Sequence, residues 1–193
     1  MSQLRMLSQI HAPLIVHQEE PKWIFMRPSK TAGSSIREVL TKRFPNAFSG
    51  KSDPDQYAEW LSHDIKLGEY YRFSVCRNPF SRIVSASTYF RANTVRDFID
   101  SLTDSPQRSA HVVPCHCYAF CGTEPFVDDI LRFEQIDKDI HRVFEVLGIS
   151  GPLPHINRTR HGHWNRHLAA TDKEWVQRHY ARDFKLFGYD PEK

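Results

Sequence analysis

Hydrophobic residues in this chain fall into short runs and into stripes at helical spacing. Three runs have the length of buried strands: residues 23–27, 71–76 and 128–134. Apolar residues spaced three or four apart follow each run, and they predict three helices with stripes that begin at Ile36, Phe80 and Ile140. Because strands alternate with helices, the pattern predicts the α/β class, with a central parallel sheet flanked by helices.

The rest of the pattern predicts two further helices and several loops. Thr94 can cap one helix, and Thr171 with Glu174 forms a capping box that opens the last helix. Segments rich in proline, glycine and polar residues are predicted as loops: 44–56, 105–114 and 151–167. Residues 1–20 are poorly patterned and are predicted to form an N-terminal arm of a single domain, residues 1–193.

Composition and charge narrow the class of protein. No apolar stretch approaches the roughly 18–20 residues that span a bilayer, and the first residues lack the pattern of a signal peptide. We therefore expect a soluble, cytoplasmic protein without a membrane span. A net charge of only +3 does not call for nucleic-acid binding, and none is expected. The isoelectric point near 8.7 still permits a local basic pocket for an anionic ligand.

The segment after the first strand, residues 27–35, is suited to an anion, and we call it the first corner. Its sequence, RPSKTAGSS, lacks the G-x-x-x-x-G-K-[ST] spelling of nucleoside-triphosphate sites. Backbone N–H groups at the start of the following helix favour a negative group, Lys30 adds a mobile charge, and Gly33 lets the backbone approach closely. Further donors are the hydroxyls of Thr31, Ser34 and Ser35. The alternative is an ordinary helix start beside a solvated lysine.

The segment after the second strand repeats this arrangement, and we call residues 76–85 the second corner. Arg77 stands at the strand end, and Ser85 lies two helical turns further along the same face. An arginine fork with a serine hydroxyl suits a phosphate monoester. The alternative is a surface arginine turn. Open parallel sheets bind ligands at the carboxyl ends of their strands, so two such corners together favour a ligand with two anionic groups.

The two corners carry a specific resemblance. SKTAGSS and FSVCRNPFSRIVSASTYF resemble the paired cofactor signatures of the sulfotransferase superfamily that uses 3′-phosphoadenosine 5′-phosphosulfate (PAPS). The chain is most similar to the carbohydrate (heparan and chondroitin) branch and its bacterial relatives. The likeness extends through HVVP, DDILRFEQIDKD, LPHINRT and HYARDFKLFGYD, and so covers roughly residues 23–190. One departure is Ser29, which stands where relatives often have proline.

The resemblance implies a P-loop-kinase-like sulfotransferase fold and an enzyme that moves a sulfuryl group from PAPS to an acceptor hydroxyl, releasing 3′,5′-bisphosphoadenosine (PAP). The acceptor it implies is a carbohydrate, another glycan or a small metabolite, and no metal is required. The cofactor-binding residues that it implies are Arg27, Lys30, Thr31, Ala32, Gly33, Ser34, Ser35, Arg77, Ser85, Arg158, Thr159 and Arg160. Lys30 would neutralise the leaving oxygen. Residues 158–160 either cover the nucleotide as a lid or form a solvated basic loop.

An acceptor hydroxyl must lose a proton, and His63 is the first candidate base. A histidine precedes the 3′-phosphate strand in glycan sulfotransferases, and LSHDIKL is the matching segment here. Histidine suits a base at neutral pH, although a lone histidine is more often structural. Other candidates are Glu59, Asp64 and His111. His111 also resembles the acceptor-contacting histidine of an H-x-x-P-Q segment, in which Cys115 replaces the glutamine.

Three alternatives remain open. Cys115, Cys117 and Cys121 lie close to His111 and raise the possibility of zinc, but C-x-C spacing is less typical of structural zinc than C-x-x-C, and we expect no metal. A P-loop-type ATP-dependent kinase shares the strand–loop–helix cradle but needs groups for Mg²⁺ that are not evident here. A non-catalytic binder of nucleic acid or another anion would also fit the basic loops.

Arg132 and Glu134 are predicted to form a structural ion pair.

Overall fold

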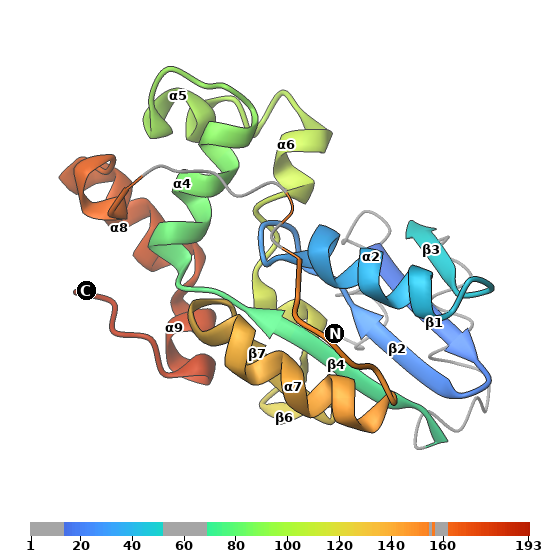
Figure 1. The fold of residues 1–193 in the computed structure, drawn as a ribbon. Coiled ribbons are helices and arrows are strands. Elements are labelled where there is room, and N and C mark those ends of the chain that lie inside the picture. Colours follow the sequence, from blue (N-terminus) through green and yellow to red (C-terminus); the bar gives the residue numbers. More distant parts are fainter. Residues whose placement is uncertain (1–13, 52–68, 155, 157–161) are drawn as a thin grey trace.

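A computed structural model describes residues 14–51, 69–154, 156 and 162–193 of the chain. Its centre is a five-stranded sheet in the order β3-β1-β2-β4-β7 (Figure 1). The strands are β1 (Leu14–Glu19), β2 (Lys22–Met26), β3 (Phe48–Lys51), β4 (Tyr71–Cys76) and β7 (Asp129–Arg132). A separate two-stranded sheet joins β5 (Phe120–Cys121) to β6 (Glu124–Pro125).

The sheet is mostly parallel, as expected of the α/β class. β2 pairs in parallel with β4, with Met26 opposite Ser74, and β4 pairs in parallel with β7, with Cys76 opposite Arg132. β1 runs antiparallel to both of its neighbours, β2 and β3. The carboxyl ends of β2, β4 and β7 therefore meet at one edge of the sheet, where both corners begin.

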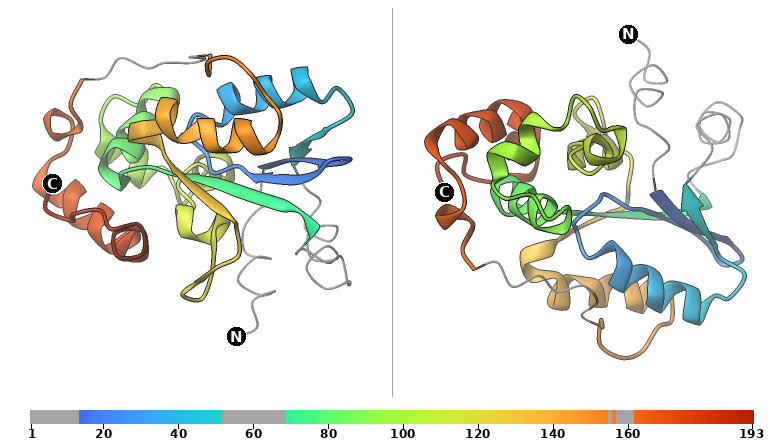
Figure 2. Two further views of the ribbon diagram at one scale, coloured as in Figure 1. Left: turned by 60° about the horizontal axis from the view of Figure 1, so that its bottom comes forward. Right: turned by 90° about the horizontal axis from the view of Figure 1, so that it is seen from above.

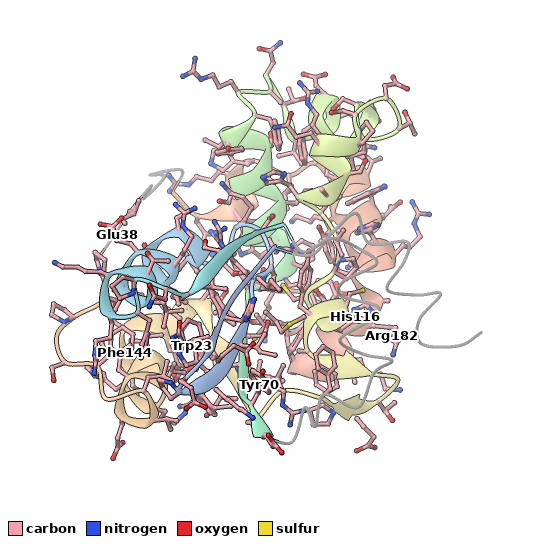
Figure 3. The ribbon with its side chains drawn as sticks, turned by 90° about the vertical axis from the view of Figure 1, so that its right-hand side faces the viewer. Trp23, Glu38, Tyr70, His116, Phe144 and Arg182 are labelled. Carbon is pink, nitrogen blue, oxygen red and sulfur yellow. The ribbon has the colours of Figure 1, made fainter. Side chains whose placement is uncertain are left out.

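Helices α2 (Gly33–Arg43) and α7 (Ile136–Val146) cover one face of the sheet, as the left view of Figure 2 shows. Alternate strand residues such as Trp23, Phe25 and Phe73 pack against them in one buried cluster, which includes Phe144. Figure 3 labels Trp23 and Phe144 on this side of the molecule and His116 away from them. Burial of these large side chains fixes the orientation of the strands that lead into both corners.

The opposite face is covered by the segment that carries the short helix η2 (Cys115–Tyr118) and by the end of the chain. Ile24, Met26 and Cys76 point to this side and pack with Tyr118 and Phe187. Because side chains alternate along a strand, the same strands supply both faces.

A third cluster lies beyond the carboxyl edge of the sheet, where several helices pack together (Figure 1). The helices are α4 (Pro79–Tyr89), α5 (Val95–Asp100), α8 (Ala170–His179) and α9 (Ala181–Phe187). The short helices α6 (Pro106–Ala110), η3 (Phe133–Gln135) and η4 (Trp164–Arg166) belong to the connections. No helix among the described residues is long and apolar enough to cross a membrane.

The three predicted strands and the helices behind them are confirmed, but four local predictions are wrong. Residues 14–19 of the predicted arm form β1, and residues 48–51 of the predicted 44–56 loop form β3, because β1 pairs with strands on both sides. The predicted loop 105–114 contains α6, which Pro106 begins and Ser105 caps through its hydroxyl. In α8 the cap is Ala169, whose N–H donates to Asp172, and Thr171 lies inside the helix.

Candidate active site

The first corner connects β2 to α2 through a backbone with two left-handed residues. Lys30 has φ 68° and Ala32 has φ 62°, a region that residues other than glycine rarely occupy. The Thr31 hydroxyl donates to the Pro28 carbonyl at 2.7 Å and braces the turn from inside. Strained backbone of this kind clusters at ligand sites because the surrounding structure must hold it in place.

The helix that follows the first corner has an open N-terminus. Its N-cap residue, Ala32, makes no side-chain hydrogen bond, and no acidic residue lies in the first turn. In α4, by contrast, the Asn78 side chain accepts hydrogen bonds from the N–H groups of Phe80 and Ser81. The N–H groups and positive dipole end of α2 are therefore offered to an anion, whereas the second corner must bind through its side chains.

Arg27 lies across the start of α2 and depends on Gly33 for its position. A Cβ atom at Gly33 would lie 2.7 Å from both Cγ and Nε of Arg27, so any other residue there would displace the arginine. The Arg27 guanidinium donates to the Ser34 hydroxyl at 3.3 Å. Gly33 thus allows a second positive charge beside that of Lys30.

The three hydroxyls of the first corner that are predicted to bind the cofactor, those of Thr31, Ser34 and Ser35, are not equivalent. Thr31 and Ser35 are buried and already have protein partners, since Thr31 donates to Pro28 and the Ser35 hydroxyl accepts from the Ile156 N–H at 3.0 Å. Ser34 is half-buried and contacts Arg27. The contact of Ser35 with Ile156 also fastens the chain after α7 to the first corner.

The second corner is tied to the first by Arg77. Its Nε donates to the Ser81 hydroxyl at 3.0 Å, and its Nη1 donates to the Lys30 carbonyl at 2.9 Å. The guanidinium carbon lies 3.9 Å from the centroid of the Phe133 ring. Ser85 is buried two turns along α4, as the spacing predicts. Arg77 therefore shapes the Lys30 turn as well as placing a positive charge at the end of β4.

Arg82 makes a second bridge, which the sequence interpretation missed. It is 1 % exposed, and its guanidinium donates to the carbonyls of Ser29 at 3.0 Å and Val113 at 2.8 Å. One arginine thus joins α4, the first corner and the segment after α6. The available signal was its position within the apolar stripe of α4, between Phe80 and Ile83, where an arginine must find buried acceptors.

Lys30 points toward an aromatic ring near the end of α4. Its Nζ lies 4.1 Å from the centroid of the Tyr89 ring, a cation–π distance. Burial lowers the pKa of Lys30 to about 8, and the nearby Arg77 adds to this shift. Burial and Arg77 therefore disfavour the charged form of Lys30. An anion bound at the first corner would favour that charged form.

His111 lies against the same ring, that of Tyr89. Its ring stacks on Tyr89 with centroids 5.3 Å apart, and its Nδ1 is 2.9 Å from the Gln107 carbonyl. Since a carbonyl only accepts, Nδ1 carries the proton and Nε2 has the free lone pair. Burial lowers the pKa of His111, the Gln107 hydrogen bond opposes this, and the charge of Lys30 lowers it further. A neutral imidazole is the form that can accept a proton.

Arg132 and Glu134 do not form the predicted ion pair among the described residues. Glu134 accepts from the Asn78 N–H at 2.7 Å and from the Tyr189 hydroxyl at 2.8 Å, while Arg132 donates to the Phe187 carbonyl. Both side chains hold the end of the chain against the ends of β4 and β7. The predicted ion pair is therefore replaced by contacts of each side chain with other partners.

Several predicted site residues lie outside the described residues: His63, Glu59, Asp64, Arg158, Thr159 and Arg160. The cysteine segment lies on the η2 side of the sheet, where Cys115 is fully buried. Within the described ranges, no group of three or more histidine, cysteine or acidic side chains is placed to hold a metal.

An open helix N-terminus with Lys30 and Arg27 is joined to a second basic corner at the next strand end of an α/β sheet. This arrangement is suited to a ligand with two anionic groups. The model of the sulfotransferase family matches residues 6–190, and the chain belongs to this family. The resemblance to its carbohydrate branch is consistent with that membership. No curated protein and no solved structure matches the chain.

Proposed function

We propose that the protein transfers a sulfuryl group from PAPS to the hydroxyl of a carbohydrate, another glycan or a small metabolite. The observation that carries this proposal is the pair of cationic corners at neighbouring strand ends, tied together by Arg77. A nucleotide with a phosphosulfate on its 5′ side and a phosphate on its 3′ side has two anionic groups to match them. Family membership supports sulfuryl transfer as the reaction.

The described residues fit such a donor. The first corner offers the uncapped start of α2, the Lys30 ammonium and the Arg27 guanidinium, and the first turns of α2 and α4 contain no acidic residue. Arg77 and Ser85 would hold the 3′-phosphate through side chains, since Asn78 occupies the start of α4. Residues 158–160 are proposed to cover the nucleotide. When bound, the donor supplies the sulfuryl group that is transferred.

Lys30 is the residue proposed to stabilise the reaction electrostatically. Sulfuryl transfer places negative charge on the oxygen that leaves with the nucleotide, and an ammonium at that oxygen lowers the barrier. The strained turn, held by Arg77 at the Lys30 carbonyl and by Arg82 at the Ser29 carbonyl, fixes the backbone from which this side chain extends. By holding this turn, Arg77 and Arg82 position the Lys30 side chain.

The pKa of Lys30 predicts how activity depends on pH. A lysine is charged below its pKa, so raising the pH through about 8 removes the ammonium that the reaction needs. We expect kcat/KM, which reports the free enzyme, to fall above pH 8 and to approach a tenfold loss per pH unit. The falling limb of kcat should lie at higher pH, because bound anions favour the charged lysine. A kcat/KM that stays constant to pH 10 would contradict the role of Lys30.

Two histidines are proposed as the base that takes the acceptor proton. The resemblance points to His63. The geometry supports His111, because its Nε2 carries the lone pair and its ring stacks on Tyr89, the ring that Lys30 also contacts. The function is tested by measuring the transfer of labelled sulfuryl groups from PAPS to a panel of sugars, glycans and small hydroxyl compounds. The same assay on alanine variants of His63 and His111 tests which histidine is the base. A protein that transfers label to no acceptor while its PAPS remains bound would count against the function.

We expect alanine in place of the true base to lower kcat by roughly 10²–10⁴-fold while leaving PAP affinity within about twofold. His141→Ala, at an exposed position on α7, is the matched control and should retain full turnover. If a variant loses PAP affinity together with turnover, that histidine shapes the site and is not the base. If both variants keep full turnover, neither histidine is the base.

A further inference from the structure

A cysteine, a histidine and an aspartate that have no proposed role in sulfuryl transfer are in contact where η2 packs against α9. In η2 the Cys117 sulfur is 3.6 Å from Nε2 of His116. On the other side of the ring, His116 Nδ1 is 2.6 Å from Oδ1 of Asp183, which belongs to α9. A nucleophile, a base and a residue that orients the base occur in this order in enzymes with activated cysteines.

Asp183 is held firmly enough to orient the imidazole. It is completely buried, and its carboxylate also accepts the N–H groups of Cys115 at 2.8 Å and His116 at 2.9 Å. Because the carboxylate only accepts, His116 must carry a proton on Nδ1, which directs Nε2 to the sulfur. Burial disfavours the imidazolium, but hydrogen bonds to Asp183 and Cys117 outweigh it and raise the pKa of His116 to about 9, which favours the imidazolium that forms when Nε2 takes the thiol proton.

Cys117 differs from the other thiols in the described part of the chain. Cys76 and Cys115 are buried, and burial raises the pKa of Cys76 to about 11 and that of Cys115 further still. Cys117 is half-buried and has the imidazole beside it. Of these three thiols, Cys117 is the one that is both accessible to a small reagent and next to a proton acceptor.

We propose that Cys117 is a nucleophilic thiol, activated by His116 and positioned by Asp183, and that small hydroperoxides oxidise it. His116 Nε2 takes the thiol proton, and the thiolate attacks one peroxide oxygen. A sulfur–oxygen bond forms as the oxygen–oxygen bond breaks, and the departing hydroxide or alkoxide takes the proton from the imidazolium and leaves as water or an alcohol. Sulfur is oxidised to sulfenic acid and the peroxide is reduced, so no further reagent is needed.

The first test compares Cys117 with itself in the folded and unfolded chain. Intact protein is treated with iodoacetamide at pH 7, and peptide mass spectrometry follows the alkylation of each cysteine. Partial burial alone would slow Cys117, whereas an activated thiol should react about tenfold faster in the folded chain than in urea. Cys76 and Cys115 are internal controls that should react more slowly when folded. A Cys117 rate equal to or below the unfolded rate would overturn the proposal.

Two variants separate activation from exposure. His116→Gln, checked for folding by circular dichroism, should lower the Cys117 alkylation rate about tenfold, because amide nitrogen is no base. Hydrogen peroxide with a sulfenic-acid trap should label Cys117 in the unaltered protein and leave Cys117→Ser unlabelled at this peptide. If His116→Gln reacts at the original rate, or if peroxide labels other cysteines first, His116 does not activate Cys117.

Discussion

Replacing Lys30 with alanine should lower kcat for sulfuryl transfer by about 10²–10³-fold, the usual cost of one preorganised charge-stabilising donor. Lys30 extends from a turn that Arg77 and Arg82 fix by their hydrogen bonds to backbone carbonyls. Its ammonium is half-buried, where water screens charge less than at the surface. No other lysine lies in the first corner, and the remaining positive charge there, on Arg27, is held by its hydrogen bond to the Ser34 hydroxyl.

The backbone makes this substitution a clean test. Lys30 adopts φ 68°, and alanine pays the same steric cost there because both residues have a Cβ atom. The ligand-free variant should be at least as stable as the original protein, because a charge whose pKa is lowered by burial is removed. Lys22→Ala, a surface lysine at the other end of β2 paired with Glu69, is the matched control and should keep full turnover. Near-normal turnover in Lys30→Ala would show that another group stabilises the leaving oxygen.

Sequence pattern could predict the parts of this fold in which neighbouring residues decide the outcome. The runs that become β2 and β4 and the helical stripes behind them are local signals, and they place both corners correctly. β1 and β3 could not be predicted in this way. β3 is the segment FSGK, which contains glycine and serine and becomes a strand only because β1 pairs with it.

The candidate site shows the same division. Lys30 and Arg77 were predicted because each follows a strand in a basic turn. The hydrogen bond from Arg77 to the Lys30 carbonyl joins residues 47 apart in sequence, and that from Arg82 to the Ser29 carbonyl joins residues 53 apart. No local pattern indicates such contacts. Likewise, the stacking of His111 on Tyr89 depends on how α6 packs near the end of α4.

The central claim is that the two corners bind a nucleotide with phosphates on both its 5′ and 3′ sides. Thermal unfolding of the intact protein with PAP, compared with ADP and Mg²⁺, tests this claim most directly. A ligand at 100 times its Kd adds about 2.7 kcal/mol of stability, which raises the Tm of a chain of this size by roughly 5–10 °C. Ser85→Ala should reduce the PAP shift and leave any ADP shift unchanged, because it removes a proposed 3′-phosphate ligand.

We predict a Tm increase of this size with PAP and little or none with ADP and Mg²⁺ at the same concentration. An ATP-dependent kinase would give the reverse order, because its site has no use for a 3′-phosphate and requires the metal. Greater stabilisation by ADP and Mg²⁺ than by PAP would contradict the assignment of the two corners to a PAPS-type donor.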